Sequence, residues 1–270
     1  MSAISEESKL HLRESTEQKI EEVTKEVDSL YSLLRKMEIV RSLAKEKGAE
    51  LNLEGIENLI KFRLLIGLLM LDLASCIRMY SNAKFQYEGL FAAKQVIIII
   101  NEGYKTIYGY LQKNDHNQVK TAQRNKSFWI REIGKIIEYD LPELKNEYAT
   151  LTKALDDYSI VDFDNLKKQR SLFVHYDKGT IELYQELSEL DIDTTFRKLI
   201  PFLEIMKGMF AFTDTIIKLY AQKTEDARSA RQKEIEDSIL SFNQFKNEHN
   251  EKLIQEFQEK ALKLFRSINN

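Results

Sequence analysis

The chain has 270 residues, of which 43% are hydrophobic and 31% are charged, and its formal net charge is -3. Only two prolines and nine glycines occur, and because strands and tight turns need such residues, we expect long helices joined by short loops. A slightly acidic chain lacks the strongly basic surface of proteins that coat nucleic acid. The net charge therefore excludes a protein that coats nucleic acid, but a local basic site can still occur.

Cysteine usage and hydropathy exclude further classes of protein. Cys76 is the only cysteine, so neither an intrachain disulfide nor a cysteine-rich zinc site can form, which suits a reducing cytoplasm. Residues 1–19 contain no apolar segment typical of a secretory signal. The apolar run at 64–71 falls far short of the roughly 20 residues that a membrane span needs. We therefore expect a cytoplasmic protein without a membrane segment.

The first predicted element is a long helix over residues 5–47. Its apolar residues alternate spacings of three and four, which makes a heptad seam. Such a seam fits either an amphipathic helix lying on its own domain or a coiled-coil contact with a partner. Gly48 supplies a helix stop signal. The seam consists of Ile20, Val23, Val27, Leu30, Leu34 and Met37.

Residues 51–82 and 83–111 are predicted to form two central helices. The middle of the first is apolar on all sides, which is typical of a buried helix. In the second, four consecutive isoleucines at 97–100 would suit a strand, but the residues on both sides continue a helical pattern. We therefore expect helix through 97–100 and no sheet of three or more strands.

The second half of the chain is predicted to hold shorter helices and then two long ones. Asp191 is placed to cap the helix that follows it, and Pro201 favours a kink or restart within that helix. The predicted elements in chain order are a polar loop at 112–127, helices at 128–139 and 143–158, an acidic loop at 156–164, the segment 163–176, and helices at 195–220 and 221–268.

Together these elements predict an all-α protein in three parts: an N-terminal long helix at 1–50, a helical bundle at 51–220, and a C-terminal long helix at 221–270. The apolar seam of residues 20–37 and a thin apolar stripe at 235–264 both need cover. We expect the two end helices to pack on each other or on a second subunit, which predicts a homodimer.

The segment from Lys167 to Asp177 carries the residues best suited to chemistry. Arg170 is always charged and can donate two parallel hydrogen bonds to a phosphate. His175 can accept or donate a proton near neutral pH. Together they supply the minimum for cutting a phosphodiester, a base for the 2′-hydroxyl and a cation for the developing charge. Lys167 and Lys168 add positive charge for such a substrate. The alternative is a core histidine beside a surface arginine.

The spacing of Arg170 and His175 restricts how they can act together. Five residues place them about 140° apart around a regular helix, so one regular helix cannot aim both at one ligand. Either a helix begins between them, or two copies of the motif meet at a two-fold interface. The site also needs a partly exposed His175 and an Arg170 free of a saturating carboxylate.

The motif and its surroundings resemble the HEPN superfamily, the higher eukaryotes and prokaryotes nucleotide-binding domains. The resemblance covers about residues 58–220. Its two parts are an Arg-x4-His motif near a late helix and a long central helical stretch. These are Arg170-x4-His175 with Tyr176-Asp177 and the later helix 196–220, and the stretch from Arg78 to Glu88 leading into Ala92-Ala93.

The resemblance implies a HEPN-like helical bundle core flanked by two long amphipathic helices, and a metal-independent endoribonuclease of a bacterial defence or toxin–antitoxin system. Arg170 would stabilise the phosphorane, and His175 would be the general base or acid. Ser171 stands where the family usually has Asn, Asp or His, and it can still hydrogen-bond to a substrate. RNA, a second subunit and an antitoxin or regulatory protein are the expected partners, with no cofactor. The alternative function is a non-catalytic helical interaction or RNA-binding module that dimerises through its long helices.

Further candidate residues lie outside the motif. Arg124 and Lys126 precede Trp129, so the cations could hold phosphates while the indole stacks on a base. The alternative is a solvated loop beside a core tryptophan. Glu88 is a candidate for orienting a catalytic group from a neighbouring helix, and the alternative is a solvated or capping glutamate. The other histidines show no metal-ligand spacing, and no glycine-rich phosphate loop occurs, so no metal or nucleotide site is predicted.

Overall fold

The computed structural model describes residues 6–51, 53–109, 112–113, 119–120, 125–160, 163–174 and 179–268. The chain separates into two compact units, Met1–Ile217 and Lys218–Asn270. Within the described residues the strands are β1 (Gln112–Lys113) and β2 (Val119–Lys120), which pair antiparallel. The prediction of an all-α protein without a larger sheet is therefore confirmed for this part of the chain.

The first three helices follow the hydrophobic periodicity of the sequence. They are α1 (Glu6–Glu46), α2 (Glu54–Asn82) and α3 (Gln86–Tyr108). The isoleucine run lies inside α3, where Ile97 and Ile100 are buried. It forms helix because tertiary packing of an apolar face outweighs the modest strand preference of β-branched residues.

The later elements differ from prediction at their boundaries. The stretch at 156–164 was expected to be an acidic loop, but it is helical as far as Ile160. Tertiary contacts stabilise this helix: Leu155 is fully buried, and its carbonyl accepts a hydrogen bond of 3.0 Å from the Tyr104 hydroxyl. The expected restart at Pro201 does not occur, since one helix continues through it. The elements are π-helices η1 (Trp129–Ile133) and η2 (Ile136–Asp140), the 3-10 turn η3 (Pro142–Leu144), α5 (Lys145–Ile160), α6 (Phe163–Val174), α7 (Thr180–Glu189) and α8 (Ile192–Ile268).

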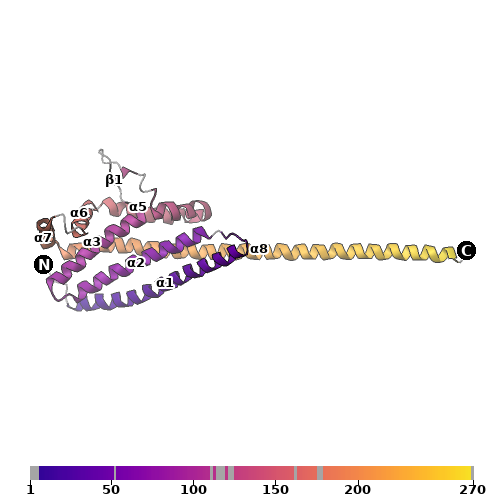
Figure 1. Cartoon of the computed structure of the whole chain (residues 1–270), viewed down its shortest axis with the longest axis horizontal. Coiled ribbons are helices and arrows are strands. Elements are labelled where there is room, and N and C mark those ends of the chain that lie inside the picture. Colours follow the sequence, from indigo (N-terminus) through magenta and orange to yellow (C-terminus); the bar gives the residue numbers. More distant parts are fainter. Residues whose placement is uncertain are drawn as a thin grey trace. The chain divides into compact units, whose positions relative to one another are not determined.

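The heptad seam of α1 packs on α2 within the first unit. Figure 1 shows the two helices side by side, and Val23, Leu30 and Met37 of the seam are buried. Leu30 and Met37 form a cluster with Ile60 of α2. Of the two interpretations of the seam, the structure therefore shows an amphipathic helix that covers its own chain.

Gly67 lets α1 approach α2 closely. A Cβ added at Gly67 would lie 2.8 Å from a Val27 methyl carbon. Gly67→Ala is expected to lower the free energy of unfolding by about 1–3 kcal/mol through overpacking, although alanine is the better helix former. Urea unfolding followed by circular dichroism measures the change. In a Val27→Ala background the same substitution should no longer destabilise, and an unchanged cost there would contradict this explanation.

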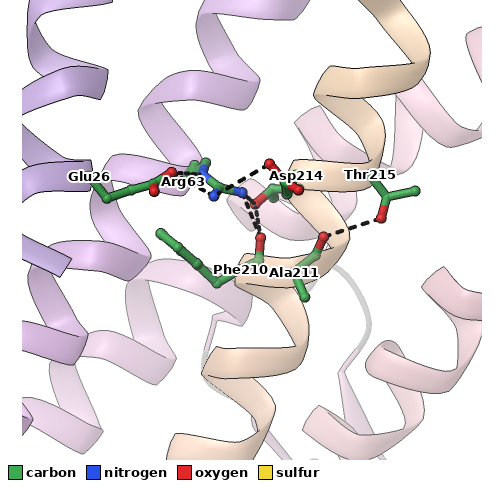
Figure 2. A network of polar contacts seen from close by, with 7 residues as sticks. Glu26, Arg63, Phe210, Ala211, Asp214 and Thr215 are labelled. Carbon is green, nitrogen blue, oxygen red and sulfur yellow. Dashed lines mark hydrogen bonds and ion pairs between the residues drawn. The ribbon is translucent and has the colours of Figure 1, made fainter. Parts of the chain in front are cut away.

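A buried arginine joins α1, α2 and the part of α8 that belongs to the first unit (Figure 2). The Arg63 side chain is 6% exposed, and its Nη2 lies 2.6 Å from Glu26 Oε1 of α1. Its Nη1 donates to the Phe210 carbonyl at 2.8 Å and to Thr213 Oγ1 at 3.3 Å, and its Cζ lies 4.0 Å from the centroid of the Phe210 ring. Asp214 Oδ1 is 3.7 Å from Nη2. Burial of this charge is tolerated because it is paired and hydrogen-bonded.

Candidate active site

Helix α6 carries the arginine of the motif and packs on α3. Phe173 is its buried anchor, and the Lys94 ammonium of α3 lies 5.9 Å from the centroid of the Phe173 ring. Lys168, Ser171 and Val174 are exposed on the other side of α6. Residues three apart share one face of a helix, so burial of Phe173 places Arg170 beside α3, at the edge of the packed surface.

Arg170 forms an ion pair with Glu102 of α3, from Nη2 to Oε1. The arginine side chain remains 25% exposed. Glu102 also lies 3.8 Å from Lys105 Nζ, one turn further along α3. Arg170 Nε is buried, and among the described residues nothing accepts a hydrogen bond from it, so the exposed part of the guanidinium lies elsewhere. The carboxylate therefore engages one part of the guanidinium, which has five N–H donors in all.

The structure bears on two expectations about the motif. The site needs an Arg170 that no carboxylate saturates, and Glu102 pairs with it through Nη2 alone. The suggestion that a helix begins between Arg170 and His175 is wrong, because α6 includes Arg170 and continues to Val174. His175 follows directly and lies outside the described residues, as do the Lys167 side chain and Arg124. A two-fold interface between copies stays a prediction.

Trp129 is a core residue, and the interpretation in which its indole stacks on a base is wrong. The side chain is fully buried and stacks on Tyr148 with ring centroids 4.8 Å apart. Its Nε1 donates to Thr152 Oγ1 at 2.9 Å, which satisfies the buried polar group. Lys126, three residues earlier, is exposed, so this cation of the predicted surface faces solvent while the indole does not.

Glu88 caps α3 and does not orient a catalytic group. Its Oε2 accepts hydrogen bonds from the backbone N–H groups of Lys84 at 2.6 Å and Phe85 at 3.1 Å. The backbone N–H groups of Phe85 and Lys84 lower the pKa of the Glu88 carboxyl below its ordinary value. Of the roles predicted for Glu88, the structure therefore shows the helix cap.

Glu102 is the residue that sequence reasoning missed. It lies on the same helix as Glu88 but about four turns later, on the face that α6 covers. A signal was present, because Asn101 and Glu102 form a polar pair within an otherwise apolar stretch of α3. A polar pair that interrupts a buried helix usually meets a polar partner.

Helix α7 is tied to α6 beside the arginine. Gln169, the residue before Arg170, donates a hydrogen bond from Nε2 to Glu186 Oε1 of α7 at 2.7 Å. Leu183 of α7 is buried, whereas Ile181 and Tyr184 are exposed. The Gln169 side chain, next to Arg170, therefore links α6 to α7.

Two classes of site are not found in the described part of the chain. No three His, Cys, Asp or Glu side chains there are grouped so that they could hold a metal ion. No helix in the same residues has the length and apolar character needed to cross a membrane.

Comparison with protein families, with curated proteins and with solved structures finds no match to this chain.

Proposed function

We propose that this chain is a metal-independent endoribonuclease with a HEPN-like bundle, acting in a cytoplasmic defence or toxin–antitoxin system. Arg170 stabilises the negative charge that develops on the phosphorane. His175 acts as general base or acid for the 2′-hydroxyl or the leaving oxygen. RNA is the substrate, and two copies of the motif line one cleft at a two-fold interface.

One observation supports this proposal most directly. The Arg170 side chain is 25% exposed, and Glu102 holds its guanidinium through Nη2. An arginine held by a carboxylate is oriented before a substrate arrives, and its remaining donors suit a phosphate. An arginine whose donors were all used in the fold would not suit this role.

The test is a gel assay of RNA cleavage in EDTA, with the wild type compared with His175→Ala. We expect the wild type to cleave without metal and His175→Ala to lose cleavage while its melting temperature stays nearly unchanged, because a catalytic side chain in an open cleft contributes little packing. A loss of stability by about 2–5 kcal/mol, the scale for deleting a packed core side chain, would make His175 structural and refute the proposal.

A second candidate function is a non-catalytic helical interaction module. Ile239 and Leu240 of the second unit are exposed, as are Leu33, Val40 and Leu43 of α1. Leu33, Val40 and Leu43 follow the spacing of one face of α1, and exposed apolar residues in such a row favour contact with another helix. Under this alternative the wild type forms a dimer in solution but cleaves no RNA in EDTA.

A further inference from the structure

We propose that Lys105 of α3 binds the RNA phosphate next to the one that Arg170 contacts. This inference rests on the proposed ribonuclease function and adds a second cation to its substrate site. The Lys105 side chain is 50% exposed, compared with 25% for Arg170. A lysine binds phosphate as a point charge on a flexible stem, so an exposed ammonium beside the arginine suits this role.

One carboxyl group joins the two cations. Glu102 Oε1 contacts Arg170 Nη2, and Glu102 Oε2 lies 3.8 Å from Lys105 Nζ. The two positive charges thus lie at different oxygens of a single negative charge. Consecutive phosphates of a strand are separated by one sugar, a distance comparable with the span of a carboxyl group and its two contacts. The cations are therefore spaced for neighbouring phosphates of one strand.

The Glu102–Lys105 pair differs from a pair of the same spacing elsewhere in the first unit. Lys207 follows Glu204 by three residues on α8, and its Nζ lies 2.6 Å from Glu204 Oε1. The 3.8 Å between Lys105 Nζ and Glu102 Oε2 is beyond hydrogen-bond distance. The contact of Glu102 with Arg170 accounts for this difference, because it directs the carboxylate toward α6. A phosphate at Lys105 would therefore displace no hydrogen bond between Lys105 and Glu102.

Lys105 lies at the end of α3 that α6 leaves accessible to solvent. Helix α6 covers α3 at Lys94, which is buried and lies beside the Phe173 ring. Lys105 is about 16 Å further along the axis of α3, one turn beyond Glu102. Since half of its side chain is exposed, a strand can reach Lys105 from solvent without displacing α6.

The salt dependence of RNA binding measures a phosphate contact apart from cleavage. A fluorescent 2′-O-methyl oligoribonucleotide lacks the attacking hydroxyl and is uncleavable, so fluorescence anisotropy in EDTA reports its Kd for the full chain. We expect Lys105→Ala to raise the Kd about fivefold at low salt. It should also reduce the slope of log Kd against log salt by about 0.7, the value for one phosphate of a single strand. Lys207→Ala is the matched control, because Lys207 is 52% exposed and follows its glutamate at the same spacing; it should leave the Kd and the slope unchanged.

A second background tells a direct contact from an effect on the arginine. It combines Arg170→Ala with Glu102→Gln, so that no unpaired carboxylate is left to attract Lys105. If Lys105 binds its own phosphate, Lys105→Ala raises the Kd by the same factor in this background, because independent contacts add. If Lys105 acts only by positioning Arg170 through Glu102, its effect disappears there and the inference is refuted.

The outcomes separate this inference from the proposed function. If the wild type cleaves RNA and Lys105→Ala binds the probe with the Kd and salt slope of the wild type, the phosphate contact is wrong and the ribonuclease stands. If Lys105→Ala weakens binding as expected but the wild type cleaves nothing, the phosphate contact stands and the ribonuclease is wrong. If the wild type does not bind the probe, the inference is refuted.

Discussion

Arg170→Ala is expected to lower the rate of RNA cleavage by about a hundredfold or more, the effect of removing one donor that stabilises a developing negative charge. The guanidinium is the cation of the motif, and Glu102 holds it at the α3–α6 contact. Single-turnover cleavage in EDTA measures the loss of the chemical step. The KM should change less than kcat, because this interaction strengthens mainly in the transition state.

Two variants make this prediction specific. Lys168→Ala removes an exposed cation two residues away on the same helix and should change cleavage by less than tenfold, because an exposed charge contributes mainly to association. Arg170→Lys keeps the charge but loses the planar fork and should restore only part of the rate. Equal losses in Lys168→Ala and Arg170→Ala would show that net charge matters and that Arg170 has no particular role.

Glu102→Gln separates positioning from simple charge pairing at the same site. The amide keeps the size of the side chain but removes the charge that attracts Arg170. If Glu102 orients the guanidinium, kcat falls while binding of the uncleavable RNA is retained. A higher kcat in Glu102→Gln would instead show that the carboxylate competes with the phosphate for Arg170.

Arg63→Ala is expected to destabilise the first unit by about 2–5 kcal/mol, the scale for truncating a packed buried side chain. Its carboxylate partners Glu26 and Asp214 are each 40% exposed, so the substitution leaves neither of them as a buried charge. The substitution removes hydrogen bonds to Glu26, Phe210 and Thr213 together with the stacking on the Phe210 ring. Thr213 is fully buried, so its hydroxyl would keep only the bond that it donates to the Phe210 carbonyl at 2.8 Å. Urea unfolding at neutral pH measures the change.

A matched surface arginine provides the control for this substitution. Arg35 pairs with Glu38 at 3.0 Å, one turn away on the same helix, and both side chains are mostly exposed. Arg35→Ala should change the free energy of unfolding by less than about 1 kcal/mol. If Arg63→Ala costs no more than Arg35→Ala, the network in Figure 2 is not what joins α1, α2 and α8.

Sequence reasoning predicted well what depends on near neighbours in the chain. An α-helix closes its hydrogen bonds between residues four apart, so the spacing of apolar residues and the scarcity of proline and glycine were enough to place α1, α2 and α3. The cap at Asp191 is equally local: its carboxylate accepts a hydrogen bond from the Thr194 N–H at 3.2 Å. The candidate arginine was found for the same reason, since its motif is one continuous segment.

Only the tertiary structure decided which helix faces meet. Arg170 and Glu102 are 68 positions apart in the sequence, and Arg63 reaches both Glu26 and Phe210 across 37 and 147 positions. The same is true of Trp129, for which the sequence left both a base-stacking ring and a core ring open, and whose stacking on Tyr148 decides for the core. A helix face has no preferred partner in the local sequence, because the free energy of packing depends on shape and polarity across the contact. For that reason the sequence determined the helices of this protein and its motif, and the tertiary structure determined which carboxylate holds the arginine.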